Sequence, residues 1–266
     1  MWLVAAAVAG GTSACAEPLG LRAKEHFHLF LLLGQSNMAG RGTPEMVDRE
    51  PNPRVLMFTR ENCWVAATEP MHFDRSAAGV GPGRSFGVRI AERFPGITVG
   101  LVPCAVGASA IESWRPGILH AATKKHPWDD ALRRAKLALR DGTLKGILWH
   151  QGESDAKGME LARAYEARLH DLIRRLREEL HAHDVPFIAG QLGKFPDAPW
   201  DDARKLVDTA HQALPRKVPH TAFVSAEGLQ HRGDKVHFDS PSYRELGSRY
   251  AEAFFRLSSG KLRDHE

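Results

Sequence analysis

Short apolar runs of strand length alternate with amphipathic helical patterns along most of this chain. The clearest helical pattern spans 159–181, where apolar residues recur at spacings of three and four. Strands that alternate with helices pair in parallel, so the pattern predicts a parallel sheet with helices on both faces. The expected strands are 27–33, 55–59, 97–102, 146–149, 186–189 and 221–225, and the expected helices are 84–94, 128–139, 159–181, 201–214 and 242–257.

The composition is that of an ordinary globular protein. Of the 266 residues, 43% are hydrophobic and 26% are charged, and no low-complexity tract divides the chain, so we expect one domain over 17–266. The basic residues behind the net charge of +4 are interleaved with acidic ones, which argues against a nucleic-acid-binding surface. The segment 40–83 is rich in Pro, Gly and Asn, and we interpret it as a long surface insertion near the functional site.

The beginning of the chain differs from the rest. A short apolar run is followed by small residues at 14 and 16, which fits a signal-peptidase site, so 1–16 is a predicted signal peptide although no basic residue precedes the run. The run is far shorter than the ~20 residues that cross a bilayer, and we expect a secreted or periplasmic protein without a membrane span. Its first mature residue would be Glu17. Cys63 and Cys104 could then pair, or remain separate buried thiols.

A serine between glycines follows the first expected strand. The sequence GQSNMAG occupies 34–40, with Ser36 near its centre. An open parallel sheet binds its ligand beyond the carboxyl ends of the strands, and glycines allow the sharp turn that exposes a hydroxyl. Ser36 is therefore a candidate nucleophile, with backbone N–H groups nearby that could stabilise an oxyanion. On this segment alone, Ser36 is more simply explained as a helix cap.

Two further strand ends offer groups that could bind a developing oxyanion. Gly107 follows the strand at 97–102 and could present its amide to an oxygen, although a glycine there is most often only a turn. The strand at 146–149 is followed by HQGESD, in which Gln151 could aim its side-chain NH₂ into the crevice. The two segments therefore supply one backbone donor and one side-chain donor.

The segment after 146–149 also contains two carboxylates and a histidine. Glu153 and Asp155 could form a metal or acid pair, but no His or Cys at ligand spacing lies nearby, so we expect no metal site. His150 beside Trp149 is interpreted as a half-buried structural histidine and not as a second base.

Asp234 and His237 precede the last expected helix. A carboxylate three residues before a histidine can turn back onto the ring, accept a hydrogen bond from one nitrogen and leave the other nitrogen facing a serine. Among the 14 histidines, His237 alone has such a partner in a loop before a terminal helix. The alternative is a capping role for Asp239 or Ser240 beside a merely superficial His237. We interpret His237 as a general base that is oriented by Asp234.

Taken together, the four segments resemble the SGNH hydrolase superfamily in the order of its motif blocks. The closer resemblance is to the sialate O-acetylesterase and carbohydrate esterase family 6 group, which is acetylxylan esterase-like. Its blocks are similar to GQSNM at 34–38, the glycine at 107, HQGE at 150–153 and DKVH at 234–237. GVGPGRSF at 79–86 is also similar to a stretch common in such esterases. Gln151 stands where the superfamily has asparagine, which is typical of the carbohydrate group.

The resemblance implies a three-layer α/β/α sandwich with a flavodoxin-like parallel sheet. It also implies two-step acyl transfer from an acetylated carbohydrate, without metal or organic cofactor. Ser36 would attack the acetyl carbonyl while His237 removes its proton, and the oxyanion would bind the Ser36 and Gly107 amides and the Gln151 side chain.

The same resemblance gives supporting roles to residues beside the nucleophile and the third block. Gln35 and Asn37 would support the site around Ser36. Glu153 would orient His237, share that task with Asp234, or brace the loop.

Two other functions compete with this interpretation. An esterase or lipase for lipid or aryl esters needs an apolar trough, to which Trp64, Met71, His72 and Phe73 could contribute. Alternatively, Trp64, Trp114 and Arg115 could hold a sugar ring. A carbohydrate-binding protein that has lost catalysis is disfavoured, because the serine, the aspartate and the histidine are all present.

Overall fold

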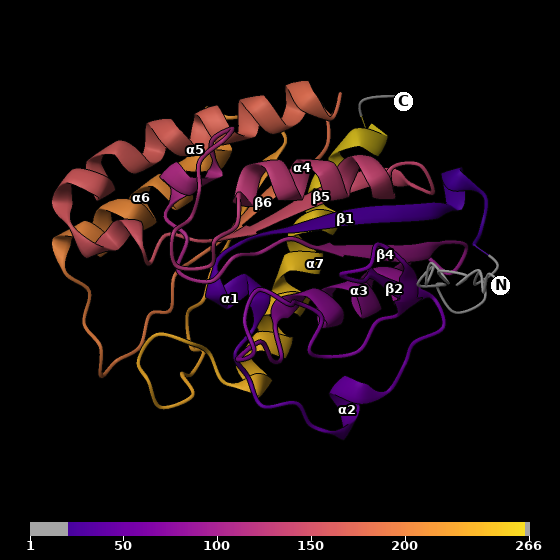
Figure 1. Ribbon diagram of the computed structural model, residues 1–266, viewed down its shortest axis with the longest axis horizontal. Helices are drawn as coiled ribbons and strands as arrows, with labels where there is room; N and C mark the ends of the chain where they lie inside the picture. The colour runs from indigo at the N-terminus through magenta and orange to yellow at the C-terminus, as the bar shows by residue number, and fades with distance from the viewer. Residues whose placement is uncertain (1–20, 264–266) are drawn as a thin grey trace, which may run out of the picture.

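The computed structural model describes residues 21–263, and the side chains of 21–259. The predicted signal peptide at 1–16 lies outside the described residues. Helices cover a seven-stranded sheet on both faces, which confirms the predicted three-layer architecture (Figure 1). The strands are β1 (Phe27–Gly34), β2 (Val55–Phe58), β3 (Trp64–Ala66), β4 (Thr98–Pro103), β5 (Thr143–His150), β6 (Phe187–Gly190) and β7 (Thr221–Val224), in the order β3-β2-β4-β1-β5-β6-β7.

The pairing of the strands is parallel except at one edge. Six strands correspond to the six predicted runs and pair in parallel, as expected. The sequence did not predict β3, which pairs antiparallel with β2 at the edge. This strand has only three residues, all of them half-buried, so it lacks the continuous apolar run that marks an interior strand.

The five long helices were all predicted, with differences at their ends. They are α3 (Pro82–Arg93), α4 (Pro127–Ala138), α5 (Met159–Glu179), α6 (Asp202–Lys217) and α7 (Ser240–Arg263). Short helical segments escaped prediction because a single turn has too few residues to show a period. These are α1 (Ser36–Ala39), α2 (Met46–Arg49), and the 3₁₀ turns η1 (Lys24–His26), η2 (Ile111–Trp114) and η3 (Asp155–Lys157).

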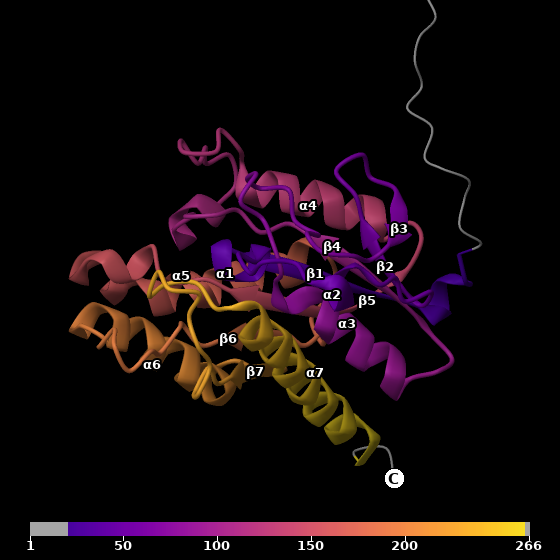
Figure 2. The same ribbon diagram turned by 90° about the horizontal axis from the view of Figure 1, so that it is seen from below.

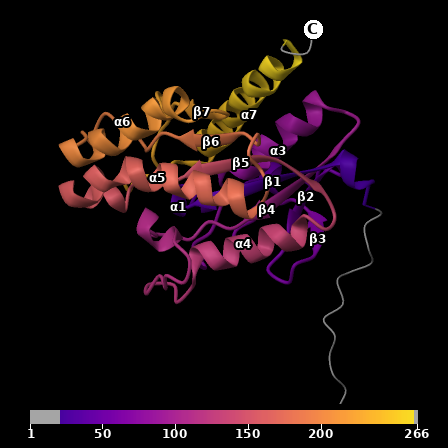
Figure 3. The same ribbon diagram turned by 90° about the horizontal axis from the view of Figure 1, so that it is seen from above.

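The central strand β1 shows how one chain segment builds both cores. Phe27, Leu29 and Leu31 face the layer formed by α4, α5 and α6, while Phe30 and Leu32 face α3 and α7. Successive side chains of a strand point to opposite faces, so an almost wholly apolar strand is buried on both. Figure 2 shows α4 on one side of the strands and α3 and α7 on the other, and Figure 3 shows α5 beside α6 from the opposite direction.

The segment 40–83 corrects one prediction. It is not simply a surface insertion, because it contributes β2 and β3 to the sheet and several buried side chains to the core. Val55 is fully buried, and the polar Asp74 is also buried. A buried carboxylate is stable only if hydrogen-bond donors surround it. The donors to Asp74 are the Arg41 guanidinium and the Gly107 N–H, which belong to other turns of the candidate site.

The carboxyl ends of β1, β4 and β5 meet at one edge of the sheet. The Val106 N–H donates to Gly34 O at 2.9 Å, and the Gln35 N–H donates to His150 O at 2.9 Å. Gly34 has φ +130°, and a Cβ there would lie 2.1 Å from His150 O. Only glycine allows this close approach. The turn that carries Ser36 is therefore fixed against the ends of both neighbouring strands.

Two further predictions concerned a membrane span and the pairing of two cysteines. No helix among residues 21–263 combines the length and the apolar character needed to cross a bilayer. Cys104 is a buried free thiol, so it does not pair with Cys63.

The double-sided core generates a prediction about stability. Phe30 is fully buried and makes edge-to-face contacts with Phe86 and Phe254, with ring centroids 4.9 and 5.2 Å apart. Phe30→Ala should lower the free energy of unfolding in urea by about 3–5 kcal/mol, because it removes these contacts and leaves a cavity. Met46→Ala is the control, since Met46 is 82% exposed and should change the value by less than about 0.5 kcal/mol. Equal effects of the two substitutions would contradict the assignment of this core.

Candidate active site

Ser36 lies at the first residue of α1, immediately after β1. Gln35 occupies the N-cap position, and no side chain caps this helix. The Ser36 hydroxyl instead lies 2.9 Å from His237 Nε2. The alternative role of Ser36 as a helix cap therefore does not apply.

His237 also contacts the predicted carboxylate. Its Nδ1 lies 2.7 Å from Asp234 Oδ2, and its backbone N–H donates to Asp234 Oδ1 at 2.8 Å. The first contact turns the ring so that Nε2 faces Ser36, and the second fixes the turn that makes this possible. Asp239 does have the capping role considered as an alternative, since its Oδ1 accepts from the Ser242 N–H. That role accompanies the Asp234–His237–Ser36 contacts and does not replace them.

Asp234 is well suited to remain ionised. Partial burial alone would raise its pKa, but hydrogen bonds from the backbone and ring of His237, and from the Val236 N–H, outweigh burial and lower the pKa. An ionised carboxylate stabilises the positive ring that forms when His237 accepts a proton.

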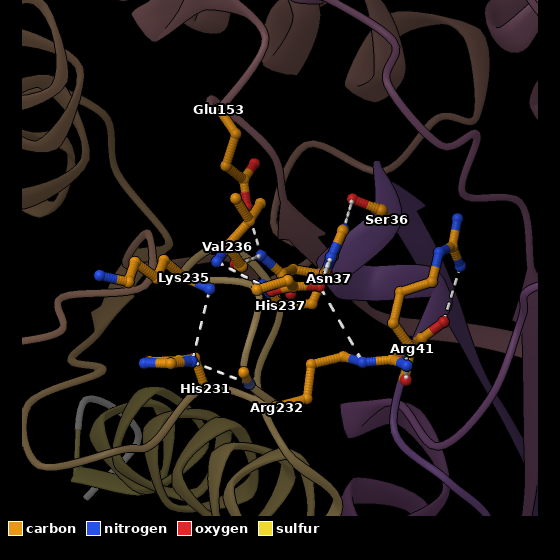
Figure 4. Close-up of polar contacts among 12 residues, drawn as sticks. Ser36, Asn37, Arg41, Glu153, His231, Arg232, Lys235, Val236 and His237 are labelled. Atoms are coloured by element: carbon orange, nitrogen blue, oxygen red, sulfur yellow. Dashed lines mark hydrogen bonds and ion pairs between the residues drawn. The ribbon is translucent and has the colours of Figure 1, made fainter. Parts of the chain in front are cut away.

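Glu153 contacts Asn37 and not His237. Asn37 Nδ2 donates to Glu153 Oε1 at 2.5 Å and to Val236 O at 3.0 Å, and Tyr243 donates to Asn37 Oδ1 at 2.6 Å. Figure 4 shows the Asn37 side chain between Glu153 and the loop that carries Val236 and His237. Of the three roles considered for Glu153, this geometry favours bracing of the loop. Burial raises the pKa of Glu153.

The orientation of Gln151 corrects a prediction. Its side-chain amide is fully buried and donates to Asp155 Oδ2 at 2.6 Å and to Ser109 O at 3.0 Å, with Gln35 Oε1 at 3.3 Å. Both N–H bonds are therefore directed into the protein, and the side chain does not point into the crevice as an oxyanion donor. Gln35 acts in the same buried network, because its Oε1 also accepts from the Ser154 N–H.

Gly107 is the second predicted oxyanion donor that the structure places differently. Its N–H donates to Asp74 Oδ2 at 2.8 Å, and Arg41 donates to the same oxygen at 2.8 Å. A Cβ on Gly107 would lie 2.6 Å from Arg41 Nη2 and 2.7 Å from Asp74 Oδ2. Gly107 is thus required by the buried Arg41–Asp74 ion pair, and its amide is not open to a ligand.

Several residues of the site were missed by sequence reasoning. Arg41 and Asp74 belong to the segment that was interpreted as a surface insertion. Tyr243 belongs to an amphipathic helix, where a large apolar side chain is expected and suggests no role in a site. Arg232 donates to Arg41 O and so ties the loop of His237 to the same ion pair. None of these residues stands in a local motif. The one available signal was the charge of Arg41 five residues after Ser36.

The residues proposed for a sugar platform or an apolar trough lie elsewhere. Trp114 is fully buried with its ring centroid 5.2 Å from that of Trp149, and Trp64 packs on Phe27 at 4.7 Å. Arg115 pairs with Glu112 on the surface, Met71 and His72 are buried, and Trp64 and Phe73 are half-buried. The buried Trp114 cannot stack on a sugar, and the ring of Trp64 already packs against Phe27.

Glu153 and Asp155 do not act as a pair, since Asp155 accepts from Gln151 and from the Ile111 N–H. Burial raises the pKa of Asp155 to about 6. No group of three or more potential metal ligands occurs in the part of the chain that the structure describes.

His150 is fully buried and not half-buried as expected, and burial lowers its pKa to about 3. His150 is therefore neutral, with Nδ1 3.1 Å from Tyr250 OH.

Comparisons with known proteins agree on one family. The family model described as carbohydrate esterase, sialic acid-specific acetylesterase, matches residues 26–256. A protein of Arabidopsis thaliana described as a probable carbohydrate esterase is 30% identical over 85% of this chain and 89% of its own length. The X-ray structure of that plant protein matches with a TM-score of 0.76 and 29% identity, over 86% of this chain and 98% of the plant chain.

Two more distant structures share the fold. NanS matches with a TM-score of 0.74 at 16% identity, over 90% of this chain and all of its own. A carbohydrate acetylesterase from Xanthomonas citri matches with a TM-score of 0.65 at 22% identity, over 87% of this chain and 57% of its own.

The buried ion pair generates a prediction about stability. Arg41→Ala should lower the free energy of unfolding in urea by about 3–5 kcal/mol, because it leaves the Asp74 carboxylate buried without its cation. Arg89→Ala is the matched control: Arg89 pairs with Glu92 and Glu252, but its side chain is 46% exposed, and the loss should be below about 1 kcal/mol. Similar losses in the two variants would contradict the role given to Arg41.

Proposed function

The chain belongs to the carbohydrate esterase family described as sialic acid-specific acetylesterase, and from this premise we propose that it is a serine esterase that removes O-acetyl groups from carbohydrates. The observation that carries the proposal is the line of hydrogen bonds from Asp234 through His237 to Ser36, with contacts of 2.7 and 2.9 Å. A serine hydroxyl whose proton an adjacent imidazole can accept is an activated nucleophile.

The first half of the reaction forms an acetyl-enzyme. His237 Nε2 accepts the proton of the Ser36 hydroxyl as Oγ bonds to the acetyl carbonyl carbon, and the carbonyl electrons move to oxygen. Asp234 stabilises the resulting imidazolium through Nδ1. As the tetrahedral intermediate collapses, the bond between the acetyl carbon and the sugar oxygen breaks, and His237 returns its proton to that oxygen.

The second half regenerates the serine. A water molecule loses a proton to His237 and attacks the acetyl-serine carbonyl. The bond to Ser36 Oγ then breaks, His237 protonates Oγ, and acetate leaves. The enzyme returns to its starting state, and one ester bond has been hydrolysed with one water.

The oxyanion requires donors other than the two that were first expected. Ser36 N–H has no acceptor among residues 21–263, and the same holds for the N–H of Ala108 in the turn after β4. Ala108 is exposed and has φ +64°, so its amide lies in the left-handed turn that follows Gly107. We assign these two amides as the oxyanion donors. Each such donor contributes roughly 3 kcal/mol to transition-state stabilisation.

Acetate release is the direct test of this function. The wild type should release acetate from at least one of acetylated xylan, acetylated sialic acid and glucose pentaacetate. Its rate on matched esters of longer acyl chains should be much lower. Ser36→Ala should lower kcat by about 10⁴-fold or more, because it removes the attacking oxygen.

Ser259→Ala provides the control, since Ser259 is an exposed serine near the end of α7 and should leave the rate unchanged. Faster release of long acyl chains would favour a lipase. Sugar binding without any ester turnover would contradict the enzymatic proposal.

The contacts of His237 predict unequal losses at two carboxylates. Asp234→Asn should lower kcat by about 10³- to 10⁴-fold, because it removes the charge that stabilises the imidazolium. Glu153→Gln keeps an oxygen to accept from Asn37 and should cost about tenfold or less. Acetate-release rates of the two variants give the comparison. Equal losses, or a larger loss at Glu153, would overturn the assignment of Asp234.

A further inference from the structure

A second histidine, His231, lies in the same loop as His237 and has no part in the mechanism described above. The loop connects β7 to α7, and an antiparallel bridge between His231 and Phe238 closes it into a turn over 231–238. Asp234 lies within this turn, and His237 lies next to its closing residue. The shape of the turn therefore decides whether the carboxylate can reach the imidazole.

The His231 ring accepts hydrogen bonds from inside this turn. The Gly233 N–H donates to its Nδ1 at 2.8 Å, and the Lys235 N–H donates to the same nitrogen at 3.4 Å (Figure 4). Lys235 has φ +61°, a backbone conformation that is unfavourable for a residue with a side chain and needs support from its surroundings. A ring nitrogen can accept only if it carries no proton. The turn thus requires the tautomer of His231 that has its proton on Nε2.

Asp197 selects that tautomer from a different segment, the connection between β6 and α6. His231 Nε2 lies 3.1 and 3.2 Å from the two carboxylate oxygens of Asp197, and a nitrogen that faces a carboxylate must donate. Lys235 reaches the same residue, because its Nζ donates to Asp197 O at 3.2 Å and lies 3.4 Å from Oδ2. Asp197 therefore contacts the turn on both sides of Asp234.

Aromatic packing couples His231 to the residue that follows His237. The ring centroid of His231 is 5.0 Å from that of Phe195, which is 5.6 Å from that of Phe238, and both contacts are edge-to-face. Phe238 is fully buried, and only 18% of the His231 side chain is exposed. A change at His231 can therefore reach the imidazole of His237 through the turn and through the core beneath it.

We propose that the Asp197–His231 pair positions the catalytic imidazole, by holding the turn in the shape that lets Asp234 contact His237. His231 is not a second base, since both of its ring nitrogens already have partners. The inference rests on the proposed function, because the position of His237 affects a rate only if His237 transfers the proton. Without the acceptor at Nδ1, the turn relaxes and the imidazole moves away from the Ser36 hydroxyl.

Asparagine and glutamine separate the roles of the two ring nitrogens. The side-chain oxygen of asparagine can replace Nδ1 as the acceptor for the Gly233 N–H, whereas the glutamine amide extends to the place of Nε2. On the acetylated substrate that the wild type hydrolyses fastest, His231→Ala and His231→Gln should lower kcat by about 10- to 100-fold with KM nearly unchanged. His231→Asn should keep kcat within about fivefold of the wild type, a rescue that a general loss of packing would not give.

A substitution of Asp197 tests the selection of the tautomer. Asp197→Ala should lower kcat by about tenfold in the wild-type background and by no more than about twofold in the His231→Asn background, because asparagine has no tautomer to select. His220→Ala is the matched control. His220 also pairs with an aspartate, Asp184, at 3.3 Å, but it directly precedes β7 and so lies at the end of the sheet opposite to the site. Its substitution should leave kcat unchanged.

Amide hydrogen exchange measures the turn without any turnover. The peptide 231–238 should exchange about tenfold faster or more in His231→Ala than in the wild type, because the turn loses an internal acceptor. In His231→Asn and His220→Ala, the exchange should stay close to that of the wild type. Circular dichroism of each variant checks that the fold is retained.

Unchanged kcat and exchange in His231→Ala, or equal losses in the asparagine and glutamine variants, would overturn the positioning role. A wild type that releases no acetate from any ester would contradict the proposed function instead. The exchange rates would then decide by themselves whether His231 holds the turn, and unchanged exchange in His231→Ala would show that it does not.

Discussion

Asn37 connects the segments that must meet for the proposed chemistry, and it does so from the residue next to the nucleophile. Its fully buried side chain donates to Glu153 and to Val236 O, and accepts from Tyr243. These partners belong to the loop after β5, the loop of His237 and helix α7. Because Val236 adjoins His237, the bond to its carbonyl oxygen sets where the imidazole lies relative to Ser36. Without the Asn37 amide, the buried Glu153 carboxyl would lose its one side-chain donor, which is a costly change.

The Arg41–Asp74 ion pair is a second connection between the same regions. Asp74 fixes the turn after β4 through the Gly107 N–H, and Arg232 reaches Arg41 O from the loop of His237. The loop is therefore attached to the rest of the site at two points, on either side of Asp234. His237 and Asp234 themselves are 24% and 42% exposed, whereas Asn37, Arg41 and Asp74 are buried. A rigid buried support beneath an accessible reactive pair is what pre-organised catalysis requires.

The sequence predicted the features that depend on local pattern. The run at 27–33 is apolar on both faces, so a buried strand of a parallel sheet could be predicted there. Asp234 and His237 are three residues apart, and their contact needs only one turn. Gln151 could not be oriented in this way, because Asp155, Ser109 and Gln35 compete for its amide from three segments. The role of Asp74 could not be predicted either, because its partners Arg41 and Gly107 lie 33 residues before and after it in the sequence. Interactions between distant segments decide such side chains, and no spacing in the sequence encodes them.

The central claim is that the imidazole of His237 activates the hydroxyl of Ser36. A serine-directed fluorophosphonate measures this activation directly, because it reacts only with a serine whose proton is being removed. Mass spectrometry of the intact and digested protein should find a single label per chain, on Ser36, and His237→Ala should abolish the labelling while the fold is retained. Labelling of another serine, or undiminished labelling of Ser36 in His237→Ala, would contradict the claim.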